Sequence, residues 1–464
     1  MVVREALPSR LRWLLDRLAR QGIYRAMNHS AKARFRAAGL LLAGLLLAGC
    51  GQGDGGSAAK PPPPPSGTQT SQAQTPDTSV APGNPTTPTE PVAAASATAK
   101  NSHGRLYTVN SCRVLELSGT PEEMGEAHGQ LLGEEVRQVV RDVLKPAPGD
   151  ARYERIIAGT RVMERFQPEP YRRELAALAK SAGVEYLDLV ALQLFGDAER
   201  GKAPAGEPAP GQERLGQQCT SFAVYGPATR NGELIAGRNF DYWPESVNAY
   251  ASLVIHYRPA KGRSFAAVTW TGVINGWTLM NDAGLVAANN NAYGADESLE
   301  GISTCFLQRL AVETCSTVDE AVELVRRSPR AVGTVMMFAG GKPPAACEVE
   351  FDHGSVAVRR AENGWVAAAN GFRALGLAKP LGPEESATRR YGALVGLIRA
   401  NHGRIDRTMN FAAAPGVPIE GINLHSALLF PADLTLAVSM GEVPACRQPY
   451  RKLRMTAKGI ESAE

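Results

Sequence analysis

A cysteine at position 219 stands where a loop gives way to a strand, and two charged residues follow on the next strand. Residues 220–226 are rich in β-branched and aromatic side chains and end on a glycine, which predicts a strand. An Asn-Gly pair at 231–232 predicts a tight hairpin turn, because both residues tolerate positive φ. The returning strand carries Arg238 and Asp241, so we expect both beside Cys219. A thiol next to a guanidinium and a carboxylate is typical of a nucleophilic site.

The Cys219 thiol needs activation, because an ordinary thiol is only a few per cent ionised at neutral pH. No histidine lies near it in the sequence. Cleavage of the peptide bond between Gln218 and Cys219 would free an α-amino group, whose unperturbed pKa is about 7.7–8.0. That amine can act as a general base near neutral pH, so one residue would serve as nucleophile and base.

Several stretches resemble the cysteine N-terminal-nucleophile (Ntn) hydrolases, and most of all the family of acyl-CoA:isopenicillin N acyltransferase (peptidase C45). Choloylglycine hydrolases and penicillin V acylases are more distantly similar. The resemblance covers about 105–450, in the family's order, and rests on segments 120–132, 218–222, 237–241, 280–285, 369–372 and 425–426. Segment 280–285 has Asp282 where the family has Glu, and 369–372 has Ala369 and Gly371 at two family positions.

The resemblance implies an α+β fold, the αββα four-layer sandwich of the Ntn hydrolases, and a self-cleaving enzyme. Cys219 would be the nucleophile, released by cleavage after Gln218, and the two products would form an α/β chain heterodimer. Relatives usually carry Gly or another small residue before the nucleophile, so Gln218 departs from that pattern.

Further site residues are carried over by position. Arg238 would favour the thiolate by its charge, and Asp241 would hydrogen-bond and orient the α-amino group. An asparagine after Leu285 would donate to the oxyanion, with Asn291 favoured over its neighbours Asn290 and Asn289. Two more residues would complete the site: Asn370, holding the amine or the substrate carbonyl, and Arg390 or its neighbour Arg389, supporting the site from a helix.

Each of these residues also has a structural interpretation. Cys219 could be half of a disulfide, and Arg238 with Asp241 could be a surface ion pair of little energetic value. The three asparagines could form a polar turn, while Asn370 and Arg390 could be a loop amide and a solvated helix cation. We expect His128 and His425 to be packed structural histidines.

The N-terminal part resembles a bacterial lipoprotein leader. Residues 27–50 comprise a basic start, a short apolar run and Leu-Ala-Gly-Cys, which predicts a signal peptide over 1–50, a true start at Met27 and lipidation of Cys50. Gly51 after the cysteine favours a periplasm-facing anchor in the outer membrane. Residues 51–103 are rich in Pro, Ser and Thr and predict a disordered tether, followed by a catalytic domain over 104–464.

Composition and motifs narrow the function classes. A formal net charge of +4 and the lack of basic runs outside the leader argue against nucleic acid. The chain has neither HExxH, CxxC nor a phosphate-binding glycine loop, so we expect no metal and no cofactor, although a coenzyme A thioester is an alternative co-substrate. Seven cysteines leave their pairing open.

The remaining pattern predicts the elements that position the site. We expect a strand over 106–117 and a capped helix beginning at Thr120 that ends before Pro146. A mobile loop is expected over 200–215. Other expected helices are 171–182, 186–194, one capped by Ser316 and Thr317, and 385–400; other expected strands are 252–257, 264–270, 279–291, 332–338, 347–351, 356–360, 365–369, 427–430 and 434–440.

These features predict an amidohydrolase or acyltransferase that acts on the linear amide of an N-acylated small molecule or peptide through a Cys219 acyl-enzyme. An acyl-CoA-dependent N-acyltransferase with the same site and a catalytically inactive envelope-binding lipoprotein are the alternatives. An apolar acyl group is expected from the aromatic residues predicted to line the pocket: Tyr242, Trp243, Trp270, Trp277 and Tyr293.

Overall fold

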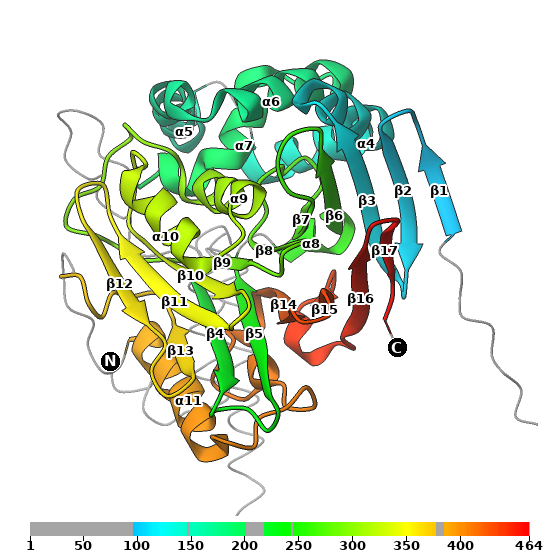
Figure 1. The fold of residues 1–464 in the computed structure, drawn as a ribbon. Helices are drawn as coiled ribbons and strands as arrows, with labels where there is room; N and C mark the ends of the chain where they lie inside the picture. Colours follow the sequence, from blue (N-terminus) through cyan, green and yellow to red (C-terminus); the bar gives the residue numbers. More distant parts are fainter. Residues whose placement is uncertain (1–95, 146–148, 201–217, 243–244, 377–384, 464) are drawn as a thin grey trace, which may run out of the picture. The chain divides into compact units, whose positions relative to one another are not determined.

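Two β-sheets packed face to face form the centre of the fold (Figure 1). The computed structural model describes residues 96–145, 149–200, 218–242, 245–376 and 385–463. Cys50, the signal peptide, residues 51–95 of the predicted tether, residues 201–215 of the predicted loop and Trp243 lie outside these ranges. Ser96–Lys100 forms strand β1, so the folded part begins before the predicted boundary at residue 104.

The larger sheet is antiparallel except where β3 and β6 run parallel. Within the described ranges its order is β1 (Ser96–Lys100), β2 (Gly104–Val109), β3 (Cys112–Gly119), β6 (Ser252–Pro259), β7 (Phe265–Trp270), β8 (Thr278–Asn281), β9 (Val286–Asn291), β10 (Thr334–Gly340), β11 (Ala345–Phe351) and β12 (Val356–Arg360). The second sheet has the order β13 (Trp365–Ala368), β4 (Gln218–Gly226), β5 (Gly232–Asp241), β14 (Asn423–Phe430), β15 (Thr435–Met440), β16 (Arg451–Thr456) and β17 (Gly459–Ser462).

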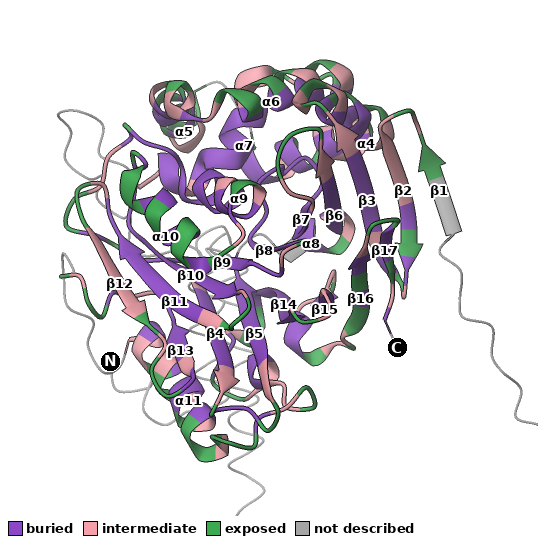
Figure 2. Cartoon of the chain, in the orientation of Figure 1, coloured by how far each residue is buried: buried purple, intermediate pink, exposed green. Residues whose placement is uncertain are grey.

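Helices cover the outer face of each sheet. They are α4 (Pro121–Leu144), α5 (Ala151–Met163), α6 (Glu169–Ala182), α7 (Tyr186–Ala198), α8 (Glu245–Ala251), α9 (Thr304–Thr314), α10 (Val318–Arg327) and α11 (Ser386–Asn401). The central strands of both sheets are buried along most of their length, whereas strands β12 and β16 and one side of the outer helices are partly exposed (Figure 2). α4, α9 and α10 pack on the larger sheet and α11 on the smaller one, so the predicted α+β fold with two layers of strands between helices is confirmed. None of the helices in the described part is long and apolar enough to cross a membrane.

Local sequence signals explain the ends of several elements. Thr120 begins α4 with a capping box, in which its hydroxyl accepts the Glu123 N–H and the Glu123 carboxylate accepts the Thr120 N–H. The predicted single strand over 106–117 is wrong, because Asn110 and Ser111 adopt positive φ and turn the chain back between β2 and β3. Helix α5 is not predicted from the sequence, because the buried face of this helix contains only a few apolar residues.

The predicted hairpin of β4 and β5 is present, but its turn differs. The loop runs over 227–231 instead of two residues, since Pro227 has no N–H with which to extend the ladder beyond Gly226. The register pairs Cys219 with Phe240 and Ser221 with Arg238. Residues two apart share a face of a strand, so Cys219 and Ser221 face the larger sheet together.

A buried polar cluster lies between the sheets behind this hairpin. Ser221 donates to the Glu348 carboxyl at 3.4 Å and accepts from the Asn290 amide at 2.6 Å. Glu348 is fully buried on β11, and burial raises its pKa from 4.5 to about 8. Its carboxyl therefore keeps its proton at neutral pH.

This pKa predicts a pH-dependent stability that Glu348→Gln removes. Between pH 4.5 and 8 the folded chain holds a proton that the unfolded chain has released, so stability falls as pH rises through this window. At about 1.4 kcal/mol per pH unit, the wild type should lose roughly 3 kcal/mol between pH 5 and 7 that Glu348→Gln keeps.

Urea unfolding at several pH values measures the difference. Glu323→Gln, at an exposed site on α10, is the matched control and should follow the wild type. Equal pH slopes for wild type and Glu348→Gln would show that Glu348 is ionised in the folded chain.

Candidate active site

Cys219 is the second residue of strand β4 and is completely buried. Arg238, from the neighbouring strand β5, directs its Nη2 at the thiol, 3.1 Å from Sγ. The same nitrogen donates to the backbone carbonyl of Asn289 at 2.6 Å, and the guanidinium carbon lies 5.1 Å from the centre of the Phe240 ring. The hairpin therefore brings together the thiol and the cation that the sequence predicts to be neighbours.

The charges around the thiol act in opposite directions. Burial raises the pKa of Cys219 above its ordinary value, and the positive charge of Arg238 offsets only part of that rise. Burial also lowers the pKa of Arg238, because the guanidinium has lost its water. Among the described residues no carboxylate forms a salt bridge with Arg238, so a Cys219 thiolate would be its direct counter-ion.

The backbone nitrogen of Cys219 is held by Asn370. This N–H donates to Asn370 Oδ1 at 2.7 Å, and the Asn370 amide donates to the backbone carbonyl of Asn291 at 2.8 Å. In the intact chain this nitrogen belongs to a peptide bond and donates to Asn370, so the expectation that Asp241 orients the freed amine stays a prediction. The Asp241 carboxylate accepts from the Ile419 N–H at 2.8 Å and the Asn423 amide at 2.7 Å, since Asp241 lies at the end of β5 beside that segment.

Asp241 is fully buried, and burial raises its pKa to about 6 despite these hydrogen bonds. Asn423, two residues before His425, is a contact that sequence reasoning missed. The contact between Asn423 and Asp241 follows from the register of β14 beside β5, which pairs these two residues. The spacing of residues in the sequence does not reveal that register.

Arg390 on α11 spans the peptide bond between residues 218 and 219. Its Nη1 donates to the Cys219 carbonyl at 2.6 Å, and its Nη2 donates to Gln218 Oε1 at 2.8 Å and to Asn370 Oδ1 at 2.9 Å. Its neighbour Arg389 is exposed. Of the two predicted arginines, Arg390 is thus the one at the site.

The three consecutive asparagines of β9 differ in their surroundings. Asn290 donates to Ser221 in the polar cluster between the sheets. Asn289 places its amide nitrogen 3.8 Å from the sulfur of Cys305. Asn291 has a buried side-chain oxygen without a hydrogen-bond partner in the described part of the chain.

His425 and Thr278 lie on the other side of Arg238. His425 Nε2 is 2.8 Å from the Thr278 hydroxyl and 3.4 Å from Arg238 Nη1. Burial first, and Arg238 second, lower the pKa of His425 well below its ordinary value, so the ring is neutral. His128 on α4 is also buried. Burial lowers its pKa to about 3, so the ring is neutral, and it accepts the N–H of Gly272.

Two structural alternatives for these residues are wrong in this structure. All six cysteines of the described ranges are free thiols, so Cys219 is not half of a disulfide. Arg238 and Asp241 are fully buried and do not form a surface ion pair. No group of His, Cys, Asp and Glu in these ranges has an arrangement that could hold a metal ion.

A comparison with known families adds to this geometry. Residues 228–402 match the model of the acyl-coenzyme A:6-aminopenicillanic acid acyl-transferase family. The chain carries this family's sequence pattern over that region. The matched region includes Arg238, Asp241, Asn291, Asn370 and Arg390, and begins after Cys219.

Curated relatives are distant and mostly longer. The chain is 27% identical over 251 residues to an uncharacterized protein of Archaeoglobus fulgidus, which covers 50% of this chain and 42% of that protein. It is 22% identical over 296 residues to protein dcd1A of Dictyostelium discoideum, covering 56% and 64%, and 23% identical over 266 residues to dcd1B, covering 50% and 49%. The chain therefore spans about half the length of the curated relatives it matches.

Solved structures give weaker matches. A Caenorhabditis elegans N-acylethanolamine-hydrolyzing acid amidase ortholog has a TM-score of 0.37 at 14% identity, covering 46% of this chain and 93% of that one. A mutant conjugated bile acid hydrolase of Clostridium perfringens has 0.38 at 13%, covering 53% and 96%, and a penicillin V acylase of Agrobacterium tumefaciens has 0.32 at 13%, covering 52% and 87%. With TM-scores this low, these structures add no argument.

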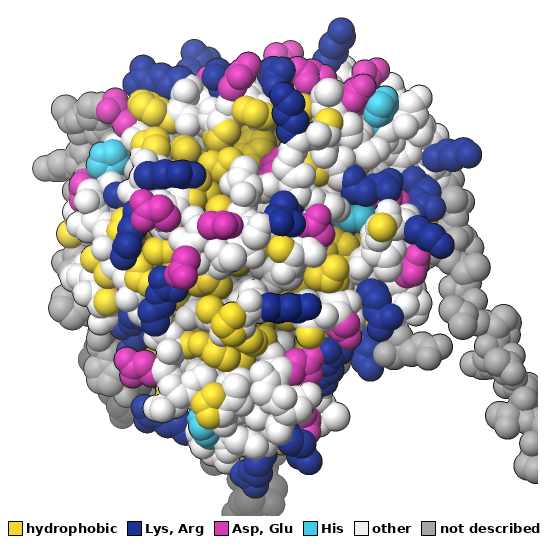
Figure 3. Space-filling view, viewed as in Figure 1, with side chains coloured by type: hydrophobic (Ala, Val, Ile, Leu, Met, Phe, Trp, Pro, Cys, Tyr) yellow, Lys and Arg dark blue, Asp and Glu magenta, His cyan; other side chains and the backbone are white. Residues whose placement is uncertain are grey.

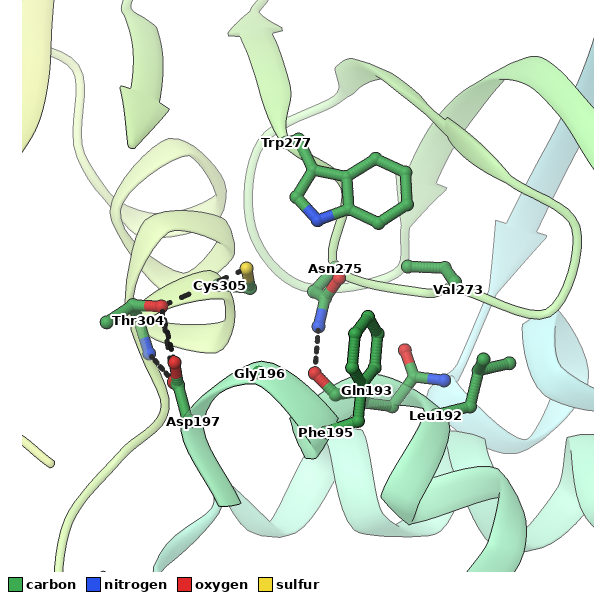
Figure 4. Close-up of a pocket in the computed structure, with 10 residues that line it drawn as sticks. All are labelled: Leu192, Gln193, Phe195, Gly196, Asp197, Val273, Asn275, Trp277, Thr304 and Cys305. Atoms are coloured by element: carbon green, nitrogen blue, oxygen red, sulfur yellow. Dashed lines mark hydrogen bonds between the residues drawn. The ribbon is translucent and has the colours of Figure 1, made fainter. Parts of the chain in front are cut away.

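A small cavity lies between α7 and the segments that carry Trp277 and Cys305 (Figure 4). Trp277 and Phe195 face it from two sides, and Cys305 lies at one end. Its volume of about 10 Å³ leaves room for about one water molecule. Trp277 stacks on Phe240 with ring centres 4.3 Å apart, and Phe240 is the strand partner of Cys219, so the cavity lies against the candidate site.

The aromatic residues predicted to line a pocket are only partly at this cavity. Of the four that the structure describes, Trp277 lines it, while Trp270 packs edge-on against Trp277 and Tyr242 packs against Phe195. Tyr293 is exposed. These aromatic residues lie apart because they belong to different strands and loops. Their spacing in the sequence does not show how those strands and loops are arranged.

The contact between Arg238 and Cys219 predicts the effect of Arg238→Gln. Loss of the cation should raise the pKa of the Cys219 thiol by at least about 1 unit, which leaves about tenfold less thiolate at pH 7. The pH dependence of Cys219 alkylation by iodoacetamide, followed by mass spectrometry, measures this shift.

Arg238→Lys keeps the positive charge but lacks the planar guanidinium. The pKa of Cys219 in this variant should lie between that of the wild type and that of Arg238→Gln. Arg399→Gln, at the exposed end of α11, is the control and should match the wild type. A wild-type alkylation profile in Arg238→Gln would show that the cation does not influence the thiol.

Proposed function

We propose that this protein is a self-processing cysteine amidohydrolase or acyltransferase that uses Cys219 as its nucleophile. The observation that carries the proposal is the buried contact of 3.1 Å between Arg238 Nη2 and Cys219 Sγ. The match of residues 228–402 to the acyl-transferase family supports the same chemistry. The substrate would be an N-acylated small molecule or an acyl peptide.

Self-processing begins with the thiol and the carbonyl of Gln218. The sulfur attacks this carbonyl carbon, the bond from that carbon to the Cys219 nitrogen breaks, and the thiol proton passes to the nitrogen. Water then hydrolyses the thioester, which leaves a carboxylate on Gln218 and a free thiol and amine on Cys219. Arg390 supports this step, because it holds the Gln218 side chain and the Cys219 carbonyl on the two sides of the bond that breaks.

The freed amine then serves as the base for the acyl-transfer reaction. It takes the thiol proton, the thiolate attacks the amide carbonyl, and the substrate amine leaves with a proton. Water or an acceptor amine releases the acyl group from the sulfur. Asn370, which already accepts from the Cys219 nitrogen, is the residue we assign to orient the amine.

Asn291 is our assignment for the oxyanion donor. The amide nitrogen of Asn290 donates to Ser221, and that of Asn289 lies near Cys305, which leaves the amide nitrogen of Asn291 for this role. Asp241 is assigned a positioning role, since its carboxylate holds the chain at Ile419 and Asn423.

The cellular setting is proposed from the sequence alone. Lipidation of Cys50 would anchor the protein to the outer membrane and face the catalytic part toward the periplasm. An acyl-CoA-dependent transferase with the same residues is the second candidate, supported by the family description. An inactive envelope-binding lipoprotein is the remaining alternative.

Intact mass of the purified protein tests self-processing. The wild type should yield two chains divided between residues 218 and 219, because Cys219 attacks its own preceding carbonyl. Cys219→Ala should remain one chain and hydrolyse no amide, while Cys219→Ser should process slowly. Two chains with the same division in Cys219→Ala would exclude self-cleavage by this residue.

Asn291→Ala tests the acyl-transfer step on an N-acyl amide. Removing one oxyanion donor should lower kcat by about 10²–10³ while KM changes little, because the donor acts mainly in the transition state. Free acid and transferred product are quantified with and without an acceptor amine, which separates hydrolase from transferase. Asn401→Ala, at the far end of α11, is the control, and an unchanged kcat in Asn291→Ala would remove this assignment.

A further inference from the structure

A pocket of about 320 Å³ lies at the edge of the fold where the two sheets meet, outside the Cys219 site. Its cations come from four separate parts of the chain: Lys100 at the end of β1, Arg105 on β2, Arg258 on β6 and Lys458 between β16 and β17. Lysine and arginine side chains gather over this part of the face, where β2, β3, β16 and β17 lie (Figure 3). The four cations are far apart in the sequence, so no run of basic residues predicts the pocket.

Two of the arginines are held in place by one buried carboxylate. Glu116 is 3% exposed, and its Oε2 accepts from Arg105 Nε at 3.1 Å and Nη2 at 2.6 Å. Its Oε1 is 2.8 Å from Arg258 Nη2. Burial opposes ionisation of Glu116, but His256, Arg105 and Arg258 together outweigh it and hold the pKa at about 2. The carboxylate is therefore always charged and fixes both guanidinium groups.

The arginines keep an outward side. Their side chains are 42% and 40% exposed, although each contacts the buried Glu116. Arg105 is also supported from beneath by the Tyr107 ring, whose centre lies 4.3 Å from its guanidinium carbon. Two guanidinium groups fixed by a single carboxylate can turn their remaining N–H groups toward a tetrahedral oxyanion.

The charge balance of the pocket favours an anion. Glu116 neutralises one of the two arginines, and Lys100 and Lys458 add two further positive charges at the rim. His103 also lines the pocket and lies 3.6 Å from Glu123, the negative group beyond this edge of the pocket. Gly459 packs against this ion pair, because a Cβ there would lie 2.9 Å from Arg105 Nη2 and 3.0 Å from Glu116 Oε2.

We propose that this pocket binds a phosphate group. The group is either the headgroup of an anionic phospholipid or a free phosphate ester. The lipid source rests on the lipidation of Cys50 proposed above, since β1, which ends at Lys100, is the first described element after that residue. The site does not depend on the chemistry of Cys219.

Binding of inorganic phosphate and of vesicles to the full chain tests the proposal. Cys50→Ser is used throughout, so that no acyl anchor contributes. Arg258→Gln with Lys458→Gln should weaken inorganic phosphate binding in calorimetry at least tenfold at constant chloride. Arg161→Gln with Lys180→Gln, two exposed cations far from the pocket, is the control of equal charge and should bind as the wild type does.

The vesicle arm identifies the source of the phosphate. The wild type is compared with the pocket variant, Arg258→Gln with Lys458→Gln, for binding to vesicles of phosphatidylglycerol and of phosphatidylcholine. A preference for phosphatidylglycerol that weakens in the pocket variant, but not in the control, identifies a lipid headgroup. Phosphate binding without a vesicle preference identifies a free phosphate ester. Equal affinity for both ligands in pocket variant and wild type, or an equal loss in the control, would overturn the proposal. Self-cleavage and amide hydrolysis should persist in the pocket variant, which keeps this test separate from that of the Cys219 chemistry.

Discussion

The candidate site depends on a buried guanidinium that forms no salt bridge with a carboxylate of the described residues. Arg238 is fully buried, and its polar contacts within those residues are the Cys219 sulfur, the Asn289 carbonyl, Thr278 and His425. Burying a charge costs several kcal/mol unless a partner compensates it. A thiolate would compensate it better than a neutral thiol, so Arg238 opposes the rise that burial causes in the pKa of Cys219.

The neighbouring histidine is consistent with this constraint. A charged His425 would place a second cation 3.4 Å from Arg238, and both burial and that arginine lower its pKa. The neutral ring packs against Phe240 with ring centres 5.2 Å apart. His425 therefore contributes shape and a hydrogen bond to Thr278 without competing for the thiolate.

Other elements hold the groups around the peptide bond at 218–219. Asn370 lies in the loop after β13, and that loop is fixed by Glu350, whose Oε2 accepts the backbone N–H groups of residues 373–375 at 2.6–3.0 Å. Glu350 Oε1 accepts from Arg359 at 2.7 Å. Arg390 reaches the same bond from α11. The site thus draws on the smaller sheet, on β9 and β11 of the larger sheet and on α11, and its geometry depends on how the two sheets pack.

Local sequence patterns predict those features that depend on residues close together in the chain. The capping box at Thr120, the hairpin of β4 and β5 and the proximity of Cys219 and Arg238 follow from spacing and from strand register. The partner of Asp241 and the position of Asn370 could not be read from spacing, because both depend on packing between segments far apart in the chain. The phosphate pocket was missed for the same reason, since its four cations come from β1, β2, β6 and the turn before β17.

Burial of the thiol explains why cleavage and catalysis would be linked. In the intact chain Cys219 is fully buried, and the adjoining cavity holds about one water molecule, which is too little space for an acyl group. Gln218 meanwhile presents a side-chain amide oxygen to Arg390 at 2.8 Å. An amide substrate offers the same kind of oxygen, so Gln218 occupies a position that a substrate carbonyl could take once the chain is cut. The bond that blocks the amine would then be the one whose loss creates both the base and the space for the substrate.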